Sequence, residues 1–125
     1  QEVKRNNAED SILFFGKKNN VESLYCNYDI YCQLSDGEAF GLSIIEAMGA
    51  GLPTIVNNIS PFDCLFPSDK VIKIEKNNNE ELKFKLLELL SANERQKLGL
   101  KGQEFVSTTF TLEKMVSHYY NLFKN

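Results

Sequence analysis

Residues 35–53 read SDGEAFGLSIIEAMGAGLP, and they place two carboxylates, Glu38 and Glu46, with seven residues between them around a glycine turn. The run after Gly41 predicts a helix, whose first backbone N–H groups have no partner inside the helix and carry partial positive charge. Leu42 and Ser43 would supply these N–H groups. The start of this helix is therefore suited to an anion such as a phosphate.

Glu46 is suited to a different part of the same ligand. A carboxylate repels a phosphate, but it accepts hydrogen bonds from both vicinal hydroxyls of a ribose or a hexose. A phosphate flanked by sugars is a nucleotide sugar. The stretch therefore predicts a site for a nucleotide sugar.

Ser43 and Glu46 also fit a purely structural pattern. Ser-x-x-Glu is the capping box, in which the Glu side chain turns back to the Ser amide and only starts a helix. The second carboxylate, Glu38, favours a ligand site, and so do the nearby small residues, because each glycine inside a helix costs about 1 kcal/mol relative to alanine. Close approach of backbone explains them better. These small residues are Gly37, Gly41, Ala47, Gly49, Ala50 and Gly51.

The stretch resembles the signature of retaining glycosyltransferases of the GT-B fold, family 4, which is Glu-x-Phe-Gly-Leu followed by Glu-Ala-Met-x-Ala-Gly-x-Pro. The likeness runs from residues 12–16 through residues 28–30 to the helical end around Phe110-Thr111. It implies an α/β fold, with a Rossmann-like parallel sheet flanked by helices and a helical C-terminal end. Residues 1–125 would be one partial nucleotide-sugar-binding domain, the C-terminal half of such an enzyme without its first strand and helix.

The resemblance implies a role for each residue of the motif. Glu46 would bind the nucleotide ribose, and Glu38, the candidate catalytic residue, would lie beside the donor hexose. The backbone from Phe40 through Gly41 to Leu42 would meet hexose hydroxyls and the diphosphate. Ser43 stands where many members have Pro, and a serine keeps an N–H that proline lacks and adds a hydroxyl toward the phosphate.

A second loop is implied to hold the nucleotide base with its backbone, and it maps to Lys17 and Lys18. Two solvated lysines on a turn explain the same residues equally well. Family members also carry an Arg and a Lys early in the donor half that neutralise the diphosphate, and no position here matches them. We therefore expect this chain alone to bind a donor weakly and not to catalyse.

The implied activity is retaining transfer of a hexose from a nucleoside diphosphate sugar to a glycan, a lipid or a lipid-linked saccharide. The acceptor would bind through the missing N-terminal half, and the departing phosphate would help to deprotonate it. No cofactor and no metal are implied. The alternative is a non-catalytic nucleotide-sugar-binding or scaffolding module.

Composition excludes several other classes of protein. With 42% hydrophobic and 25% charged residues the chain is typical of a globular domain, and its net charge of −3 argues against nucleic acid as a partner. No apolar run approaches the roughly 20 residues of a membrane span. We expect a cytoplasmic protein whose membrane contact, if any, is peripheral. Cys26, Cys32 and Cys64 form no Cys-x-x-Cys pair, which predicts reduced, buried thiols and no metal site.

The apolar pattern predicts alternating strands and helices, hence a parallel sheet with ligands at the carboxyl ends of its strands. The loops 16–20 and 35–42 both follow predicted strands and should share one rim. Lysines around the last strand indicate a sheet edge. Apolar residues at helical spacing in the last helix indicate core packing, with part of this surface exposed where the family's terminal helix crosses to the other half. The predicted strands are 12–15, 30–34, 53–56 and 71–74; the helices begin after Asn20, at residue 42, and with N-caps Asn79, Ser91 and Thr111.

Overall fold

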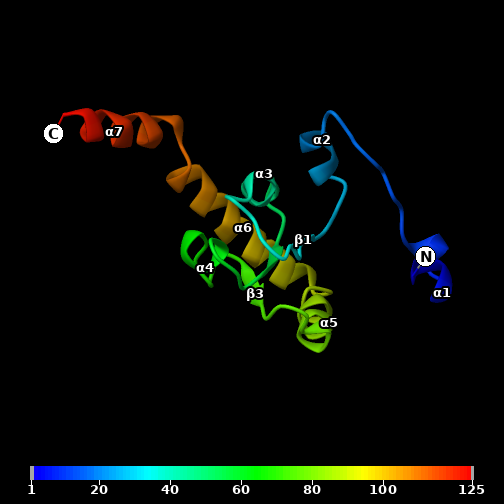
Figure 1. Cartoon of the computed structure of the whole chain (residues 1–125). Coiled ribbons are helices and arrows are strands. Elements are labelled where there is room, and N and C mark those ends of the chain that lie inside the picture. Colours follow the sequence, from blue (N-terminus) through cyan, green and yellow to red (C-terminus); the bar gives the residue numbers. More distant parts are fainter. Residues whose placement is uncertain (1, 125) are drawn as a thin grey trace.

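The computed structural model describes residues 2–124, and its centre is a three-stranded parallel sheet in the order β1-β2-β3 (Figure 1). Tyr31 pairs with Thr54 across the first two strands, and Ile55 pairs with Ile72 across the second pair. The strands are β1 (Tyr31–Gln33), β2 (Thr54–Asn57) and β3 (Ile72–Ile74). They confirm three of the four predicted strands and the edge position of the last one.

Helices connect the strands and then form the C-terminal part of the chain. Between the strands lie α3 (Leu42–Gly49) and α4 (Phe62–Leu65), and after them come α5 (Asn79–Glu88), α6 (Ala92–Thr109) and α7 (Leu112–Phe123). Before the sheet lie α1 (Glu2–Arg5), the 3-10 helix η1 (Glu9–Ser11) and α2 (Glu22–Tyr25).

The middle strand β2 is buried along its whole length, because helices cover both faces of the sheet. Val56 packs with Ile44 and Met48 of α3 on one side of the sheet. Ile55, the preceding residue, packs on the other side with Leu89 at the end of α5. Successive side chains of a strand point to opposite faces, so this one strand joins two apolar clusters.

Local capping fixes where the later helices begin. The side chains of Ser91 and Thr111 each accept a hydrogen bond from the backbone N–H three residues further on, at 3.5 and 3.2 Å. Both predicted N-caps are therefore confirmed. For α5 the cap is Asn78, one residue before the predicted Asn79, and its Oδ1 accepts from the Glu81 amide at 3.1 Å.

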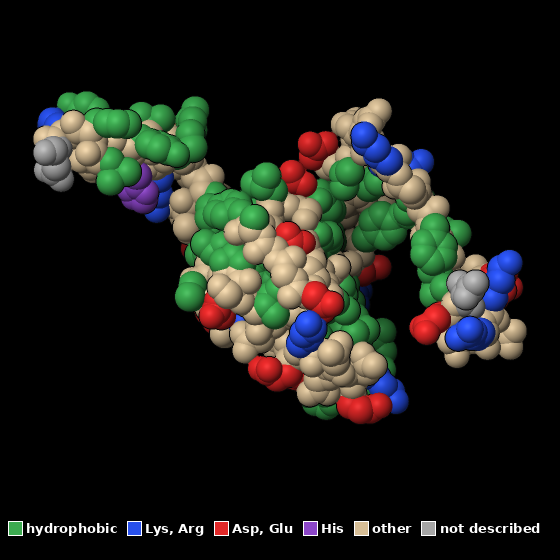
Figure 2. Space-filling view, in the orientation of Figure 1, with side chains coloured by type: hydrophobic (Ala, Val, Ile, Leu, Met, Phe, Trp, Pro, Cys, Tyr) green, Lys and Arg blue, Asp and Glu red, His purple; other side chains and the backbone are tan. Residues whose placement is uncertain are grey.

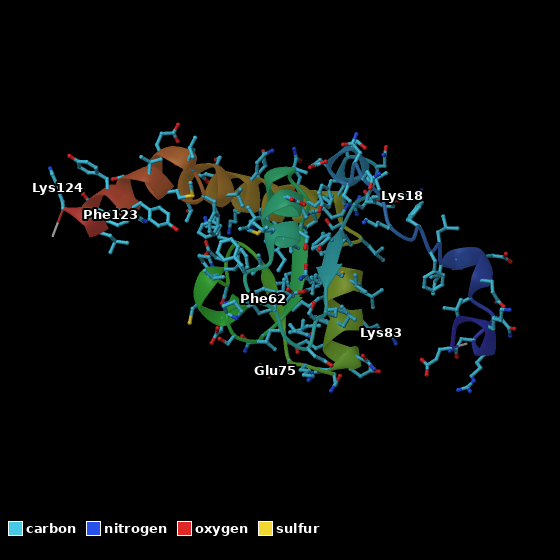
Figure 3. The ribbon with its side chains drawn as sticks, turned by 45° about the horizontal axis from the view of Figure 1, so that its top comes forward. Lys18, Phe62, Glu75, Lys83, Phe123 and Lys124 are labelled. Carbon is cyan, nitrogen blue, oxygen red and sulfur yellow. The ribbon has the colours of Figure 1, made fainter. Side chains whose placement is uncertain are left out.

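The strand predicted at residues 12–15 is wrong. This segment is extended but belongs to no sheet, and the side chains of Leu13 and Phe14 are 75% and 82% exposed. In Figures 1 and 3 it runs away from the sheet toward η1 and α1. A strand exists only where neighbouring backbone pairs with it, and among residues 2–124 no backbone does so here.

Two further expectations about burial differ from the structure. Cys26, Cys32 and Cys64 are free thiols as expected, but all three are exposed. The apolar residues of α7 are exposed rather than packed in a core, from 52% for Met115 to 86% for Phe123. Figure 2 shows them along a helix that projects beyond the sheet, where no other described segment covers them.

Candidate functional site

The helix α3 begins at a left-handed turn made by Gly41, with φ 83° and ψ 49°. This φ favours glycine, and so does the packing, because a Cβ on Gly41 would lie 2.8 Å from Phe62 Cε1 and 2.9 Å from Ile44 Cδ1. The carbonyl of Gly41 accepts from the amides of Ile44 and Ile45, at 3.0 and 3.3 Å. The glycine turn of the sequence motif is therefore confirmed as the start of a helix.

The amides at the very start of α3 have no acceptor within residues 2–124. They belong to Leu42, which is 66% exposed, and Ser43, which is partly buried. Two adjacent unpaired N–H groups at the positive end of a helix form an anion-binding geometry. The structure thus brings the predicted phosphate donors together at the protein surface.

Glu46 does not form the capping box. The N-cap of α3 is Gly41, which leaves Ser43 inside the helix, and Glu46 turns toward α2 instead. Its Oε2 accepts a hydrogen bond from the Tyr25 hydroxyl at 3.1 Å. Tyr25 is buried, and this burial, followed by the hydrogen bond to Glu46, raises the pKa of Tyr25 to about 12. The capping-box interpretation of the Ser-x-x-Glu pattern is therefore wrong.

Glu38 is held at the carboxyl end of β1 by two side chains. Its Oε1 accepts from Gln33 Nε2 at 2.6 Å and from Ser35 Oγ at 2.9 Å. The amide oxygen of Gln33 in turn accepts from Ser43 Oγ and from the Tyr31 hydroxyl, both at 2.7 Å. A continuous chain of hydrogen bonds thus links Glu38 to the first turn of α3.

Tyr31 and Tyr25 belong to the two halves of the site. Their rings meet edge to face, with centroids 6.0 Å apart. Burial raises the pKa of Tyr31 above its usual value. Both hydroxyls therefore stay protonated at neutral pH and act as donors, one to Glu46 and one to Gln33.

The remaining predicted residues fall into two groups. Phe40 lies at the site, half-exposed, and its ring packs edge to face on Phe110 with centroids 5.9 Å apart. Lys18 does not join the site by any described contact. Its Nζ lies 5.9 Å from the centre of the Phe15 ring, and within residues 2–124 no hydrogen bond or ion pair connects it to Glu38 or Glu46. Figure 3 shows Lys18 on the segment before α2.

The sequence interpretation missed Tyr25 and Gln33. Gln33 had a detectable signal, since it is a polar residue at the carboxyl end of a predicted strand, two positions before Ser35. Tyr25 had none, because its partner Glu46 is 21 residues away in the chain and meets it only in the folded protein.

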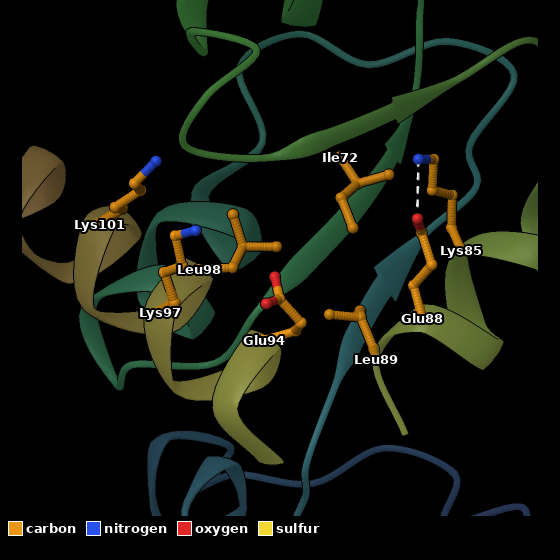
Figure 4. Close-up of a pocket in the computed structure, with 8 residues that line it drawn as sticks. All are labelled: Ile72, Lys85, Glu88, Leu89, Glu94, Lys97, Leu98 and Lys101. Atoms are coloured by element: carbon orange, nitrogen blue, oxygen red, sulfur yellow. Dashed lines mark hydrogen bonds and ion pairs between the residues drawn. The ribbon is translucent and has the colours of Figure 1, made fainter. Parts of the chain in front are cut away.

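Of the hollows of the surface, one is lined in part by Phe40, Leu42 and Ile45 of the motif. Another, of about 380 Å³, lies between β3, α5 and α6, with Ile72, Leu89 and Leu98 on its walls and the ion pair of Lys85 with Glu88 at its rim, 2.9 Å between Nζ and Oε2 (Figure 4). It contains no residue of the motif.

Within residues 2–124 no three His, Cys, Asp or Glu side chains converge as metal ligands would. None of the helices described there has the length and apolar character needed to cross a bilayer.

A parallel sheet covered by helices on both faces, with a polar helix start at the carboxyl end of a strand, is the architecture of a Rossmann-like domain. A family model described as glycosyl transferases group 1 matches residues 1–105, and the chain belongs to this family.

Similar proteins agree with the family. The chain is 31% identical to the N-acetyl-alpha-D-glucosaminyl L-malate synthase of Bacillus anthracis over 125 residues, which cover 98% of this chain and 33% of that protein. The chain therefore spans about one third of the length of this relative.

Solved structures match the fold. A variant of S. aureus TarM, in complex with fondaparinux, alpha-GlcNAc-glycerol and UDP, has a TM-score of 0.88 at 22% identity, over 98% of this chain and 26% of that one. The C-terminal domain of the glycosyl transferase group 1 family protein LpcC from Francisella tularensis has a TM-score of 0.74 at 24% identity, over 89% of this chain and 60% of that one. The fold is thus that of the C-terminal domain of GT-B glycosyltransferases.

Proposed function

We propose that this chain is the donor-binding part of a retaining glycosyltransferase of family 4. The complete protein would move a hexose from a nucleoside diphosphate sugar to a glycan, a lipid or a lipid-linked saccharide. The observation that carries this proposal is the start of α3, where the unpaired amides of Leu42 and Ser43 follow Glu38 and precede Glu46 in the chain, and both carboxylates are held by hydrogen bonds. The UDP bound by the TarM variant supports a nucleotide donor.

The diphosphate would lie against the first turn of α3. The two amides and the helix dipole stabilise the negative charge that develops on the phosphate as the sugar leaves, which is electrostatic help to the leaving group. The backbone from Phe40 to Leu42 orients the sugar next to it. We assign no nucleophile to the protein, and the leaving phosphate takes the acceptor proton on the same face of the sugar.

Each carboxylate has one oxygen available for the donor. Glu46 uses Oε2 for Tyr25, which leaves Oε1 for the ribose hydroxyls. Glu38 uses Oε1 for both of its described hydrogen bonds, which leaves Oε2 for the hexose. The positive side chains that offset the diphosphate charge would come from a part of the complete protein outside this chain, and the proposal requires neither a cofactor nor a metal.

Replacement of Glu46 by Gln in the complete protein tests this assignment. The variant keeps an oxygen for Tyr25 but loses the charge that strengthens hydrogen bonds to ribose, so donor binding should weaken about ten- to a hundredfold. Transfer at low donor concentration should fall in parallel. Glu80→Gln on the exposed start of α5 is the matched control. Unchanged turnover in Glu46→Gln would refute the ribose role.

The alternative function, a non-catalytic nucleotide-sugar-binding or scaffolding module, differs in one outcome. It predicts donor binding by the complete protein without any transfer. A separate experiment tests whether cations from outside this chain are needed to bind the diphosphate. It is calorimetric titration of the 125-residue chain with UDP, GDP and ADP. We expect dissociation constants in the millimolar range or weaker. Submicromolar dissociation constants would contradict the need for cations from outside this chain.

A further inference from the structure

We propose that Gln33 is a positioning residue of the donor site. It holds the carboxylate of Glu38 with its amide N–H and the hydroxyl of Ser43 with its amide oxygen. This inference rests on the proposed function, because it concerns how two residues of the donor site are oriented. Gln33 itself touches no ligand in this proposal.

The polarity of the network follows from Glu38. A carboxylate only accepts hydrogen bonds, so the nitrogen of the Gln33 amide has to face it, at 2.6 Å from Oε1. The amide oxygen then faces the hydroxyls of Ser43 and Tyr31, both at 2.7 Å. Both hydroxyls must donate, because an amide oxygen can only accept. The orientation of every member is thus set by the single charge of Glu38.

This polarity changes the role expected for Ser43. Its hydroxyl proton is donated to Gln33, so this proposal does not use the hydroxyl as a phosphate donor, unlike the expectation from the sequence. Ser43 then contributes its backbone amide alone at the helix start, next to the amide of Leu42. The hydroxyl instead ties the first turn of α3 to the last residue of β1.

The same contact restrains Glu38. Glu38 lies in an exposed loop, whereas Gln33 is part of β1 and is held in the sheet by pairing with Val56. A hydrogen bond to an ionised acceptor is about twice as strong as a neutral one. Fixing the carboxylate before the donor arrives lowers the ordering cost of binding. Gln33 therefore restrains the side chain of Glu38 by linking its loop to the sheet.

The substitution Gln33→Glu tests this placement through pH. The introduced carboxyl would lie beside Glu38, and two adjacent carboxylates cannot both ionise without repulsion. When the introduced carboxyl is protonated, it donates to Glu38 as the amide did. We expect donor affinity and kcat/KM of the complete protein to be lowest at high pH and to recover as the pH falls. Gln33→Met should weaken donor binding about tenfold with no such recovery.

A second readout needs no activity. In urea unfolding of the 125-residue chain, the Gln33→Glu variant should lose stability relative to the unsubstituted chain as the pH rises from 4 to 8. Gln96→Glu, an exposed position on α6, is the matched control and should show a smaller change. Gln33→Met should not show the added pH dependence.

These two readouts separate the inference from the proposed function. Equal pH dependence of unfolding in Gln33→Glu and Gln96→Glu would overturn the placement of Gln33 beside Glu38. Unchanged donor KM and kcat in Gln33→Met and Gln33→Glu, in a protein that Glu38→Gln inactivates, would overturn the positioning role. If Glu38→Gln leaves transfer intact, the proposed role of Glu38 fails, and with it the positioning role.

Discussion

The sharpest test of the fold concerns Gly99 in the middle of α6, where this helix packs against the turn that follows α3. A Cβ at Gly99 would overlap the carbonyl oxygen of Gly51 and lie 3.1 Å from its carbonyl carbon. These are backbone atoms in the short turn between α3 and β2, so they cannot yield as the end of a flexible side chain can. Gly102, one turn further on, would place a Cβ 3.4 Å from Met48 Cε and 3.6 Å from the Lys70 carbonyl, which is ordinary contact.

The same substitution should therefore have opposite effects at the two positions. Alanine favours a helix interior over glycine by about 1 kcal/mol. Gly102→Ala should keep most of this gain and leave the free energy of unfolding unchanged or up to about 1 kcal/mol higher. At Gly99 the overlap must push α6 away from the turn, and overpacking of this kind costs about 3 kcal/mol or more. Gly99→Ala should therefore lower the free energy of unfolding by about 2 kcal/mol.

Urea denaturation of the 125-residue chain, followed by far-ultraviolet circular dichroism, measures both variants on one scale. The midpoints should shift in different directions, or only the Gly99→Ala midpoint should shift. If Gly99→Ala is as stable as Gly102→Ala, then α6 does not lie against Gly51 and the described packing of α3 and α6 is wrong.

Two further predictions use the same assay. Gly41→Ala should cost about 2 kcal/mol, because alanine is strained at φ 83° and its Cβ meets Phe62, whereas Gly37→Ala, with open space around it, should be nearly neutral; equal effects would contradict the left-handed turn. The pKa of Tyr25 is about 12 in the folded protein and near 10 in the unfolded chain. The contribution of Tyr25 to the free energy of unfolding is therefore fully present below pH 10 and is lost as the pH rises from 10 to 12. Tyr25→Phe should remove this part of the decline, and an unchanged decline would show that Tyr25 is not its source.

Features with local causes were predictable from the sequence. Ser91 and Thr111 begin their helices because their side chains bond to an amide three residues away, an interaction set by spacing alone. The glycine turn at Gly41 was equally local. The run at 53–56 was recognisable because β-branched residues favour a strand and proline is tolerated at the first residue of one.

Features that depend on distant partners were not predictable in this way. The run at 12–15 has the composition of a buried strand, but composition does not supply the neighbouring strand that it needs. Ser43 and Glu46 have the spacing of a capping box, yet the helix starts earlier, at Gly41, and the fold offers Glu46 the hydroxyl of Tyr25. Pairing and side-chain partners of this kind arise only once the chain is folded.

The contact between Gly41 and Phe62 has a consequence for experiments that map function by mutation. Phe62 is fully buried in α4, and its ring lies directly beside the turn of Gly41. A smaller side chain at position 62 would let the backbone of the Gly41 turn move toward the core, and this would change the direction of the amides of Leu42 and Ser43. A mutational screen that measures only sugar transfer would then group Phe62 with the ligand-contacting residues. Phe62 is instead a buried packing residue that supports the site from inside the protein.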